Sequence, residues 1–377
     1  MKIGIDIRCL MQDRFSGVSH YTDNLLRALF SVDSENQYIL FYNTAGNRSV
    51  PKYNFKNVEY RKFSYPNKVL NFSMSFLRFP KIDKMMVGVD IIFLPNHMFF
   101  AWSEKCKKVV TMHDLSYKRF PEFISIKSKI WHYLIFSKKL CREADRIIAV
   151  SESTRNDLIR IYNIPKSKIS IIHEGVGDEF NRIVRKSEIQ DIKNKYNLPE
   201  KFFLFLGNIE ERKNINSLIF AFEEFSKKIP DADYHLVFVG DKKMRTGKLL
   251  DTLKKTSFEK KIHFTDYIQD NERLLLYSSA AVLVYPSYYE GFGLPPLEAL
   301  FAKIPVIVSF SSSMPEIVGK NAILIDPNNI SDIVNALSAV TDRYEKNVDY
   351  FNGFDTSTWS WKKTAEKTLE VFESLKP

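Results

Sequence analysis

The sequence contains few cysteines and no long hydrophobic run. Cys9, Cys106 and Cys141 are the three cysteines among 377 residues, and their odd number and wide separation fit neither a disulfide framework nor a metal-ligand spacing. The first apolar run includes Lys2 and Asp6, so it is too short and too charged for a secretory signal sequence. No apolar segment approaches the length that spans a bilayer. These absences predict a cytoplasmic protein with reduced thiols.

The sequence also lacks the motifs of nucleic-acid-binding proteins. It has no zinc-finger spacing, RNA-binding signature or helix-turn-helix pattern. The net charge of +10 nevertheless favours an anionic partner. We therefore expect a phosphorylated small molecule or an acidic lipid surface as the partner, and no nucleic acid.

The length and the order of apolar segments predict two α/β domains. A chain of 377 residues exceeds the size at which a single core stops growing. Strand-like runs alternate with helical patterns in both halves, which is typical of parallel sheets covered by helices. A polar, charged stretch over 178–200 separates the halves, so we place the domains at 1–190 and 198–359. The strand-like runs are 2–9, 38–42, 91–94, 108–112, 146–150, 169–172, 202–207, 235–240, 262–265, 281–285, 306–308 and 322–325.

The most informative stretch is a glycine loop that follows the strand-like run 281–285. In the segment 290–294, two glycines flank one phenylalanine, which lets the backbone come close to a ligand. Two prolines then mark the start of a helix, whose free N–H groups favour an anion. The prolines prevent one continuous helix, so we expect Glu290 in the loop and Glu298 in the first helical turn. The alternative is an ordinary turn with one solvated and one helix-capping glutamate.

Several polar residues and glycines share one predicted position, the carboxyl end of a strand, where parallel sheets bind ligands. Two glycine turns, two adjacent cations and a helix N-terminus at that edge describe a site for a diphosphate. The alternatives are a solvated pair of cations and a capped turn at the His-Asp step. The residues at this edge are Gly17, His113, Asp114, Arg212, Lys213, Gly240, 290–294 and Glu316.

Two further acidic patterns are less consistent with this site. Asp231 and Asp233 form an Asp-x-Asp step of the kind that holds Mg²⁺, but they precede their strand and so lie at the opposite edge. The pair Glu290 and Glu298 also resembles the acid and base of a glycoside hydrolase, but hydrolysis requires neither the basic pair nor the phosphate-binding turns. We therefore expect a metal-independent site in which fixed cations neutralise the phosphates.

A basic segment spans residues 118–142. Seven cations face a single glutamate there, and Ile126, Ile130, Tyr133 and Leu134 recur at helical spacing. The pattern fits an amphipathic helix that lies on an anionic membrane, which would make the protein peripheral to the inner face of the cell membrane. It fits equally a packed helix with a solvated basic face. The cations are Lys118, Arg119, Lys127, Lys129, Lys138, Lys139 and Arg142.

Taken together, these motifs resemble those of the retaining glycosyltransferases of family 4. The resemblance rests on the Glu-x7-Glu spacing within 286–299, the Arg-Lys-Asn step at 212–214 and the Met-Pro-Glu step at 314–316. The Ser-Gly-Val turn at 16–18 and the Ser-Trp step at 360–361 are similar to those of mannosyltransferase-type members.

The resemblance implies a GT-B fold, in which two Rossmann-like domains with parallel sheets face each other across a cleft. It implies that the C-terminal domain binds a nucleotide-diphospho-sugar and that the helix 360–377 completes the N-terminal, acceptor-side domain. The implied activity is the retaining transfer of a hexose, mannose from GDP-mannose, by front-face attack guided by the leaving phosphate. The implied acceptor is a glycan or lipid-linked saccharide in the synthesis of a cell-surface polysaccharide of the O-antigen or capsule type.

The resemblance also implies roles for individual residues. Arg212 and Lys213 would neutralise the diphosphate, and Glu298 would hydrogen-bond the ribose. His113 would contact the transferred sugar, and Ile268 falls where members pack the nucleotide base. The residues expected to act in catalysis are Glu290, His113, Arg212 and Lys213.

The remaining implied contacts come mainly from backbone. Gly17 would approach the phosphates from the N-terminal domain, while Glu290 and the loop after it would hold the sugar and the phosphates. Some members carry an arginine after the glycine at position 207, where this chain has Asn208, so neutralisation depends more on the two cations. The expected nucleotide-sugar-binding residues are Gly17, Gly207, Asn208, Ile268, Gly291, Phe292, Gly293, Leu294 and Glu298.

Three questions stay open at this point. The donor could be a UDP-sugar, used for glucosyl or N-acetylglucosaminyl transfer or for epimerisation. The chain could instead bind a sugar nucleotide without transferring it, as a partner subunit. The sequence carries no information on the oligomeric state.

Overall fold

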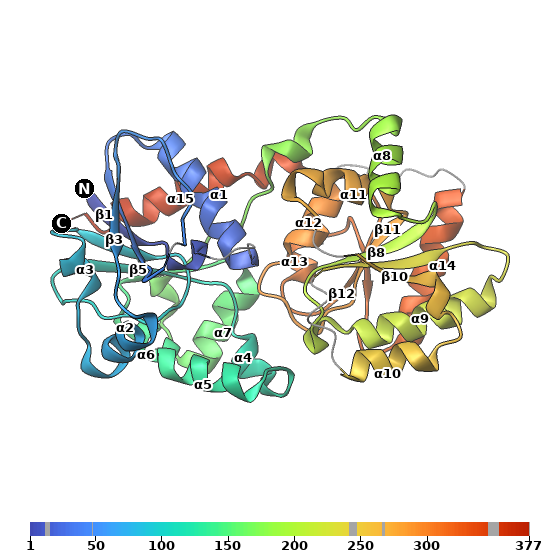
Figure 1. Cartoon of the computed structure of the whole chain (residues 1–377), viewed down its shortest axis with the longest axis horizontal. Helices are drawn as coiled ribbons and strands as arrows, with labels where there is room; N and C mark the ends of the chain where they lie inside the picture. Colours follow the sequence, from blue (N-terminus) through green and yellow to red (C-terminus); the bar gives the residue numbers. More distant parts are fainter. Residues whose placement is uncertain (12–15, 47, 241–246, 266–267, 346–353, 377) are drawn as a thin grey trace. The chain divides into compact units, whose positions relative to one another are not determined.

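The chain forms two compact α/β units (Figure 1). The computed structural model describes residues 1–377 except 12–15, 47, 241–246, 266–267, 346–353 and 377. The first unit consists of Met1–Gly175 and Thr358–Pro377, and the second of Val176–Ser357. Each unit contains one parallel sheet, as the alternation of strands and helices predicts.

The sheet of the first unit has the strand order β3-β2-β1-β4-β5-β6-β7. The direction of strand addition reverses beside β1, which pairs with β2 on one side and with β4 on the other. Such a reversal is where open parallel sheets bind ligands, outside the carboxyl ends of the strands. The strands are β1 (Lys2–Asp6), β2 (Gln37–Asn43), β3 (Val58–Phe63), β4 (Ile91–Leu94), β5 (Lys107–Met112), β6 (Arg146–Ala149) and β7 (Ile169–Ile171).

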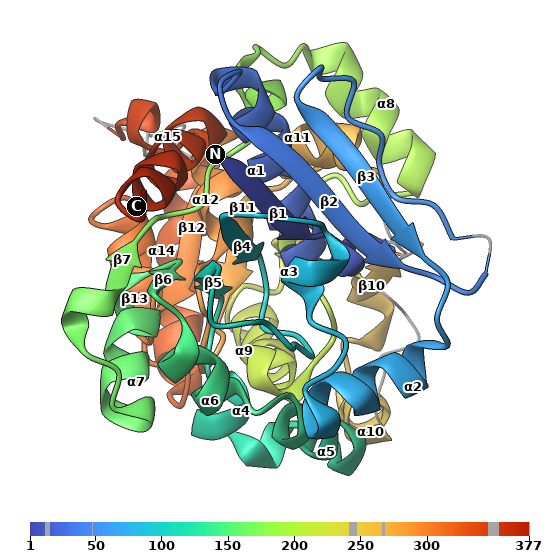
Figure 2. The ribbon, with the colours of Figure 1, turned by 90° about the vertical axis from the view of Figure 1, so that its left-hand side faces the viewer.

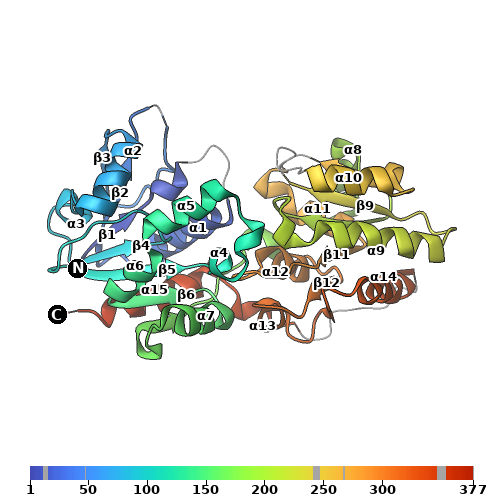
Figure 3. The same cartoon turned by 90° about the horizontal axis from the view of Figure 1, so that it is seen from below.

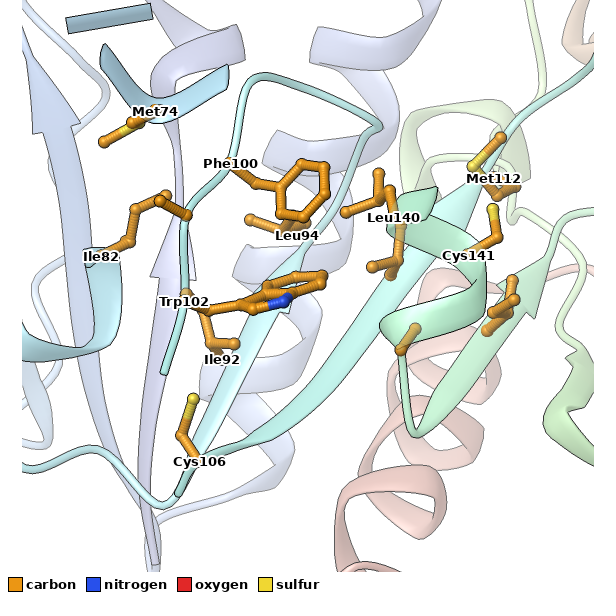
Figure 4. Close-up of a cluster of buried hydrophobic side chains, with 14 of the residues drawn as sticks. Met74, Ile82, Ile92, Leu94, Phe100, Trp102, Cys106, Met112, Leu140 and Cys141 are labelled. Carbon is orange, nitrogen blue, oxygen red and sulfur yellow. The ribbon is translucent and has the colours of Figure 1, made fainter. Parts of the chain in front are cut away.

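Helices cover both faces of this sheet. On one face, α1 (Gly17–Val32) packs against α15 (Trp361–Glu373). Side chains from the helices of the other face form a hydrophobic cluster with the strands, which includes Met74, Leu94 and Leu140 (Figure 4). The elements that contribute to this cluster are α2 (Asn67–Phe72), the π-helical turn η2 (Ser73–Leu77), α3 (Ile82–Met85), α6 (Ser137–Glu143) and α7 (Glu152–Tyr162). The helices α4 (Ser116–Arg119) and α5 (Ile126–Ile135) precede α6.

The second unit repeats this plan with the strand order β10-β9-β8-β11-β12-β13. The chain runs from β8 to β10 in one direction and from β11 to β13 in the other, so right-handed crossovers place helices on both faces. Figure 1 shows α8 and α11 on one side of the strands and α9 and α10 on the other. The strands are β8 (Phe202–Leu206), β9 (His235–Val239), β10 (Ile262–Thr265), β11 (Val282–Tyr285), β12 (Val306–Ser309) and β13 (Ile323–Ile325).

The helices of the second unit pack in two groups. In one group α9 packs against α10 and α14, and Figure 3 shows α9 and α14 side by side. In the other, α11 packs against α8 and α12, and α12 against α13. The helices are α8 (Lys186–Tyr196), α9 (Ile215–Lys228), α10 (Gly247–Lys255), α11 (Arg273–Ser279), α12 (Leu294–Phe301), α13 (Met314–Val318) and α14 (Ile330–Glu345). Among the described residues, no helix is both long and apolar enough to cross a membrane.

The edge strand β3 is absent from the sequence prediction. Its residues include Glu59, Arg61 and Lys62, and none of its side chains is fully buried. An edge strand pairs on one side alone and tolerates charged residues, so it lacks the apolar run that identifies a central strand. The register with β2, in which Leu40 lies opposite Tyr60, therefore had to come from the tertiary structure.

The boundary between the units differs from the expected one. The sequence placed the end of the first domain at residue 190, whereas the chain passes into the second unit at Val176. The reason is that the polar stretch is not a linker: it contains α8, which buries Ile192 and packs against α11. Glu188 caps this helix by accepting a hydrogen bond from the backbone N–H of Arg185 at 3.0 Å.

The C-terminal helix α15 belongs to the first unit. Phe372 is fully buried and its ring lies edge-to-face with Phe93 of β4, 5.3 Å between centroids. The backbone at the start of α15 passes so close to Gly175 that a Cβ on this residue would lie 2.2 Å from the backbone nitrogen of Trp361. Glycine is therefore required where the last helix begins.

We expect Phe372→Ala to destabilise the first unit by about 3–5 kcal/mol, because it removes a buried ring and leaves a cavity between α15 and the sheet. Urea unfolding followed by circular dichroism measures this change. Lys367→Ala, on the exposed side of the same helix, is the control and should change the unfolding free energy by less than about 0.5 kcal/mol. Equal effects of the two substitutions would contradict the packing described here.

Candidate functional site

The glycine loop of the second unit brings three charged side chains together. The carboxylate of Glu290 lies 2.9 Å from the guanidinium of Arg212 and 3.1 Å from the ammonium of Lys213. Glu290 and Lys213 are buried and Arg212 is nearly so. The structure thus joins the loop after β11 to the turn after β8, as the strand-end argument predicts.

Backbone and side-chain contacts hold both cations in place. The backbone N–H of Tyr288 donates to the carbonyl of Arg212 at 3.0 Å, and the Arg212 guanidinium donates to the carbonyl of Tyr289. Glu210 also contacts Arg212, at 3.3 Å. The Lys213 ammonium donates to the hydroxyl of Tyr285, the last residue of β11. The two cations are therefore fixed by the same loop that carries Glu290.

Glu290 is ionised in this setting. Burial alone would raise the pKa of its carboxyl group, but the charges of Arg212 and Lys213 outweigh burial and lower the pKa to about 2. Burial and the neighbouring carboxylate of Glu290 raise the pKa of Tyr285, so this residue remains a neutral phenol. The cations that the sequence assigns to a diphosphate thus already share one carboxylate.

Three serines brace the loop, a feature that the sequence prediction missed. The hydroxyl of Ser312 accepts a hydrogen bond from the backbone N–H of Glu290 at 2.8 Å, and that of Ser313 donates to the carbonyl of Glu290 at 3.0 Å. Ser309 donates to the carbonyl of Ser287 at 2.6 Å. The sequence does not indicate this role, because a serine hydroxyl carries no sign of a partner that is distant along the chain.

Two glycines of the site have backbone geometry that other residues rarely adopt. Gly293 has φ +120°, and a Cβ there would lie 2.3 Å from the methyl group of Met314. Gly207 has φ +147°, and its carbonyl oxygen would lie 2.2 Å from a Cβ on Gly240. Gly207 therefore packs against Gly240, and Gly293 packs against Met314 at the start of α13.

The start of α12 differs in detail from the prediction. The helix begins at Leu294, so the two prolines occupy its second and third positions and Glu298 its fifth, beyond the first turn. The prolines have no N–H, and the N–H of Leu297 donates to the carbonyl of Gly293 at 3.3 Å. Leu294 consequently carries the first N–H of the helix.

Glu298 is buried against two side chains that the sequence prediction did not include. The hydroxyl of Tyr277 donates to its carboxylate at 2.8 Å, and the guanidinium of Arg273 donates to the same oxygen. Burial raises the pKa of Glu298, although Arg273 opposes this shift. Arg273 and Tyr277 are four residues apart on α11, so they share one helix face, and that spacing was a usable signal.

The other predicted residues of the second unit vary in exposure. Ile268 is buried in the segment between β10 and α11, while the neighbouring Tyr267 lies outside the described residues. Asn208 is exposed. Gly291 and Phe292 are buried and Leu294 is half-buried.

Two predicted residues, Gly17 and His113, belong to the first unit. Gly17 is the first residue of α1 and is exposed, with no atom within 4 Å of a Cβ built on it. His113 follows β5, and its Nε2 lies 3.0 Å from the carbonyl oxygen of Pro95. Its Nδ1 lies 3.5 Å from the carboxylate of the buried Glu174, which the sequence prediction did not name.

The Asp-x-Asp step lies at the amino end of β9, where the sequence placed it. The carboxylate of Asp233 is 3.1 Å from the ammonium of Lys261 and 3.5 Å from the imidazole of His235. Within the part of the chain that the structure describes, no cluster of three His, Cys, Asp or Glu side chains is arranged to hold a metal ion.

Comparison with known proteins gives the family. The model described as "Glycosyltransferase Family 4" matches residues 15–180, and the model described as "Glycosyl transferases group 1" matches residues 186–352. The chain belongs to glycosyltransferase family 4. The two matched ranges lie in regions that correspond closely to the two units of the structure.

Two curated relatives of this family 4 glycosyltransferase are enzymes of Escherichia coli. This chain is 29% identical to O-antigen chain mannosyltransferase B, over 71% of this chain's length and 71% of the relative's length. It is 30% identical to the serotype-specific mannosyltransferase WbdA over 62% of its own length, which spans 29% of that longer protein.

A solved structure confirms the GT-B fold that the sequence predicts. Sucrose-phosphate synthase from Thermosynechococcus elongatus superposes with a TM-score of 0.76 and covers 99% of this chain and 98% of its own. The identity of 18% limits this likeness to the fold.

We expect Glu290→Gln to remove part of the acid sensitivity of folding. The pKa of Glu290 is about 2 in the folded protein against an ordinary 4.5, so its contribution to stability is complete above pH 4.5 and is lost as the pH falls toward 2. The difference in unfolding free energy between wild type and variant should shrink by about 2 kcal/mol from pH 6 to pH 3. Urea unfolding across that range measures it.

The matched control is Glu370→Gln on the exposed side of α15, which removes one carboxylate without disturbing a buried ion pair. Its difference from wild type should stay nearly constant with pH. A Glu290→Gln difference that is equally flat would show that the ion pairs with Arg212 and Lys213 do not hold in solution.

Proposed function

We propose that this glycosyltransferase moves a hexose, mannose from GDP-mannose, to a glycan or lipid-linked acceptor in the synthesis of a cell-surface polysaccharide. The observation that carries this proposal is the buried carboxylate of Glu290 between two cations, beside the start of a helix. The printed names of the Escherichia coli relatives support mannose as the sugar and a polysaccharide as the product.

The arrangement suits departure of a nucleoside diphosphate. Cleavage of the anomeric bond leaves negative charge on the diphosphate, which preorganised cations and backbone N–H groups stabilise. Arg212, Lys213 and the N–H of Leu294 are the groups proposed for this task. Because they are fixed by the surrounding loop, little reorganisation is needed at the moment of reaction.

We assign Glu290 two tasks in this proposal. It holds Arg212 and Lys213 at fixed positions, and it contacts the sugar of the donor. The retaining outcome is proposed to follow from attack on the same face as the leaving phosphate, which then accepts the proton of the acceptor hydroxyl. This route requires no covalent nucleophile from the protein.

Glu298 is proposed to bind the ribose, and Ile268 to pack against the base. Tyr277 and Arg273 share one oxygen of the Glu298 carboxylate, which fixes the orientation of the group. A carboxylate held in this way presents a defined acceptor to a sugar hydroxyl. The predicted roles of Gly17 and His113 toward the phosphates and the sugar stay predictions.

The donor can be identified by thermal stability. A ligand that binds the native state alone raises the melting temperature in proportion to occupancy. We expect GDP-mannose to give a larger increase than UDP-glucose, UDP-N-acetylglucosamine or dTDP-glucose, and to yield mannose transfer to mannosylated acceptors. If only a UDP-sugar raised the melting temperature, that UDP-sugar would replace GDP-mannose as the proposed donor. Mass analysis of the UDP-sugar after incubation would detect epimerisation.

Substitutions separate catalysis from binding. We expect Glu290→Gln to lower kcat by about 10²–10³-fold while nucleotide binding is kept or strengthened, because the variant frees two cations for the diphosphate. Lys213→Gln should instead weaken donor binding and kcat together. Calorimetric titration with the nucleoside diphosphate and initial-rate kinetics measure the two effects.

If Glu290→Gln kept full activity, the proposed role of the carboxylate would be wrong. If the wild-type protein bound a nucleotide sugar but transferred it to no acceptor, the chain would be a binding subunit. Melting temperatures of both variants, compared with wild type, control for loss of folding.

A further inference from the structure

The helix α5 turns its apolar stripe away from the protein. Ile126, Ile130 and Tyr133 follow the i, i+4, i+7 spacing that normally marks the buried side of a helix. In the structure they are exposed instead, Ile126 to 77% and Tyr133 to 70%. The packed-helix alternative for this segment, with apolar residues inside and a basic face outside, is therefore wrong.

A second segment, 69–79, also exposes apolar side chains. Leu70 and Met74 of α2 and η2 point into the core, where Met74 belongs to the cluster of Figure 4. The other side of the segment is apolar as well and faces solvent, with Leu77 68% exposed. Its exposed large side chains are Val69, Phe72, Phe76, Leu77 and Phe79.

The two segments form one continuous surface. The hydroxyl of Ser75 in η2 donates to the carbonyl of Leu134 in α5 at 2.9 Å. The rings of Phe76 and Phe136 lie 6.1 Å apart, edge to face. Figures 1 and 2 both show α2 and α5 at the same end of the first unit. We call this surface the apolar face; it consists of Val69, Phe72, Phe76, Leu77, Phe79, Ile126, Ile130 and Tyr133.

The apolar face is unusual for a protein surface in contact with water. Exposed apolar residues are normally scattered singly, whereas contiguous patches mark sites of interaction. The face supplies eight of the nineteen large hydrophobic side chains that are exposed among the described residues. This concentration indicates a partner for the face.

Cations are interspersed with these apolar side chains. Exposed lysines stand next to them in both segments, and Arg142 is exposed on the adjoining α6. The nearby carboxylate of Glu143 forms an ion pair with the guanidinium of Arg78 at 2.5 Å and accepts a hydrogen bond from the indole N–H of Trp102 at 2.7 Å. The exposed cations are Lys68, Lys84, Lys127, Lys129, Lys139 and Arg142.

We propose that the apolar face docks on an anionic lipid bilayer. The aromatic and aliphatic side chains insert to the depth of the headgroups, and the lysines contact lipid phosphates, which is the usual arrangement of interfacial amphipathic segments. The basic charges noted in the sequence act at the rim, while the apolar stripes of two separate segments supply the insertion.

A second copy of the chain fits this surface less well. A two-fold interface brings the same patch of both subunits together. Lysines would then face lysines across the contact, and such juxtaposed like charges oppose association. A bilayer that contains anionic lipid satisfies both the apolar and the basic side chains.

The opposite side of α5 connects this surface to the carboxyl edge of the sheet. His132 stacks on Tyr117 with 4.0 Å between ring centroids, and its Nδ1 lies 3.5 Å from Nε2 of His97, which follows β4. A docked helix would therefore place the strand ends that precede His113 close to the lipid surface. This consequence depends on the proposed function, because it matters for a lipid-linked acceptor; docking itself does not depend on it.

Vesicle flotation tests the proposal with defined lipids. We expect the full chain to float with phosphatidylcholine vesicles that contain phosphatidylglycerol, and to bind pure phosphatidylcholine at least about tenfold more weakly. Raising the salt from 0.1 M to 1 M should weaken binding, because it shortens the Debye length from about 10 Å to about 3 Å. Equal binding to both vesicle types, or to neither, overturns the proposal.

Substitutions identify the surface. The triple variants Ile126→Ser/Ile130→Ser/Tyr133→Ser and Phe72→Ser/Phe76→Ser/Leu77→Ser should each lower the partition coefficient by about tenfold or more, because they remove inserted apolar area. The matched control is Ile183→Ser/Phe220→Ser/Leu250→Ser, three exposed apolar residues of the second unit. Unchanged binding of both test variants, or equal loss in the control, overturns the proposal.

Charge substitutions provide a second, independent arm. Lys127→Gln/Lys129→Gln/Arg142→Gln should reduce binding to anionic vesicles by about tenfold or more, because it removes three cations that contact lipid phosphates. The control Lys254→Gln/Lys255→Gln/Lys260→Gln makes the same change of net charge on the second unit and should leave binding unchanged. Equal effects would mean that net charge, and not this face, attracts the protein.

Two further measurements distinguish docking on lipid from dimerisation and from loss of transfer activity. Sedimentation of the wild type should show a monomer, or a dimer that persists in the serine variants. A dimer that the serine variants abolish, together with no binding to vesicles, would assign the face to a second copy of the chain and overturn the proposal. Transfer to a water-soluble acceptor should be equal in wild type and serine variants, so loss of docking is distinguishable from failure of the proposed function.

Discussion

The second unit depends on one buried carboxylate between two cations. A charge that leaves water is costly unless it is paired and hydrogen-bonded, so Glu290, Arg212 and Lys213 each require the others. This requirement fixes the turn after β8 against the loop after β11. The serine contacts from the β12–α13 turn and the glycine geometry at Gly293 then follow, because they hold the loop in the conformation that the ion pairs need.

The second glutamate of this unit, Glu298, has a different environment. Burial raises the pKa of Glu298, and Arg273 and Tyr277 both donate to one oxygen of its carboxylate. Two carboxylates separated by one helix start thus have opposite pKa shifts. Such a separation fits two different binding tasks and not the shared acid–base task of a hydrolase pair.

In the first unit, α2–η2 and α5 show that a helical pattern of apolar residues does not predict which side of the helix faces the core. Met74 and Phe76 are two residues apart, yet one lies in the core and the other faces solvent. Both sides of the segment are apolar, which a core alone does not require. The polar stretch around α8 is the opposite case, because its charged sequence forms a packed helix in which Ile192 is buried.

The sequence by itself determined the alternation of strands and helices, the glycine loop and the residues that follow each central strand, because buried strands need apolar runs and their carboxyl ends converge at one edge. It could not identify partners that are distant along the chain, such as Glu290 with Arg212 or Glu298 with Arg273. It missed the edge strand β3, whose single pairing tolerates charge. Only the tertiary structure decided which apolar stripes are covered, since periodicity defines a face but not what packs against it.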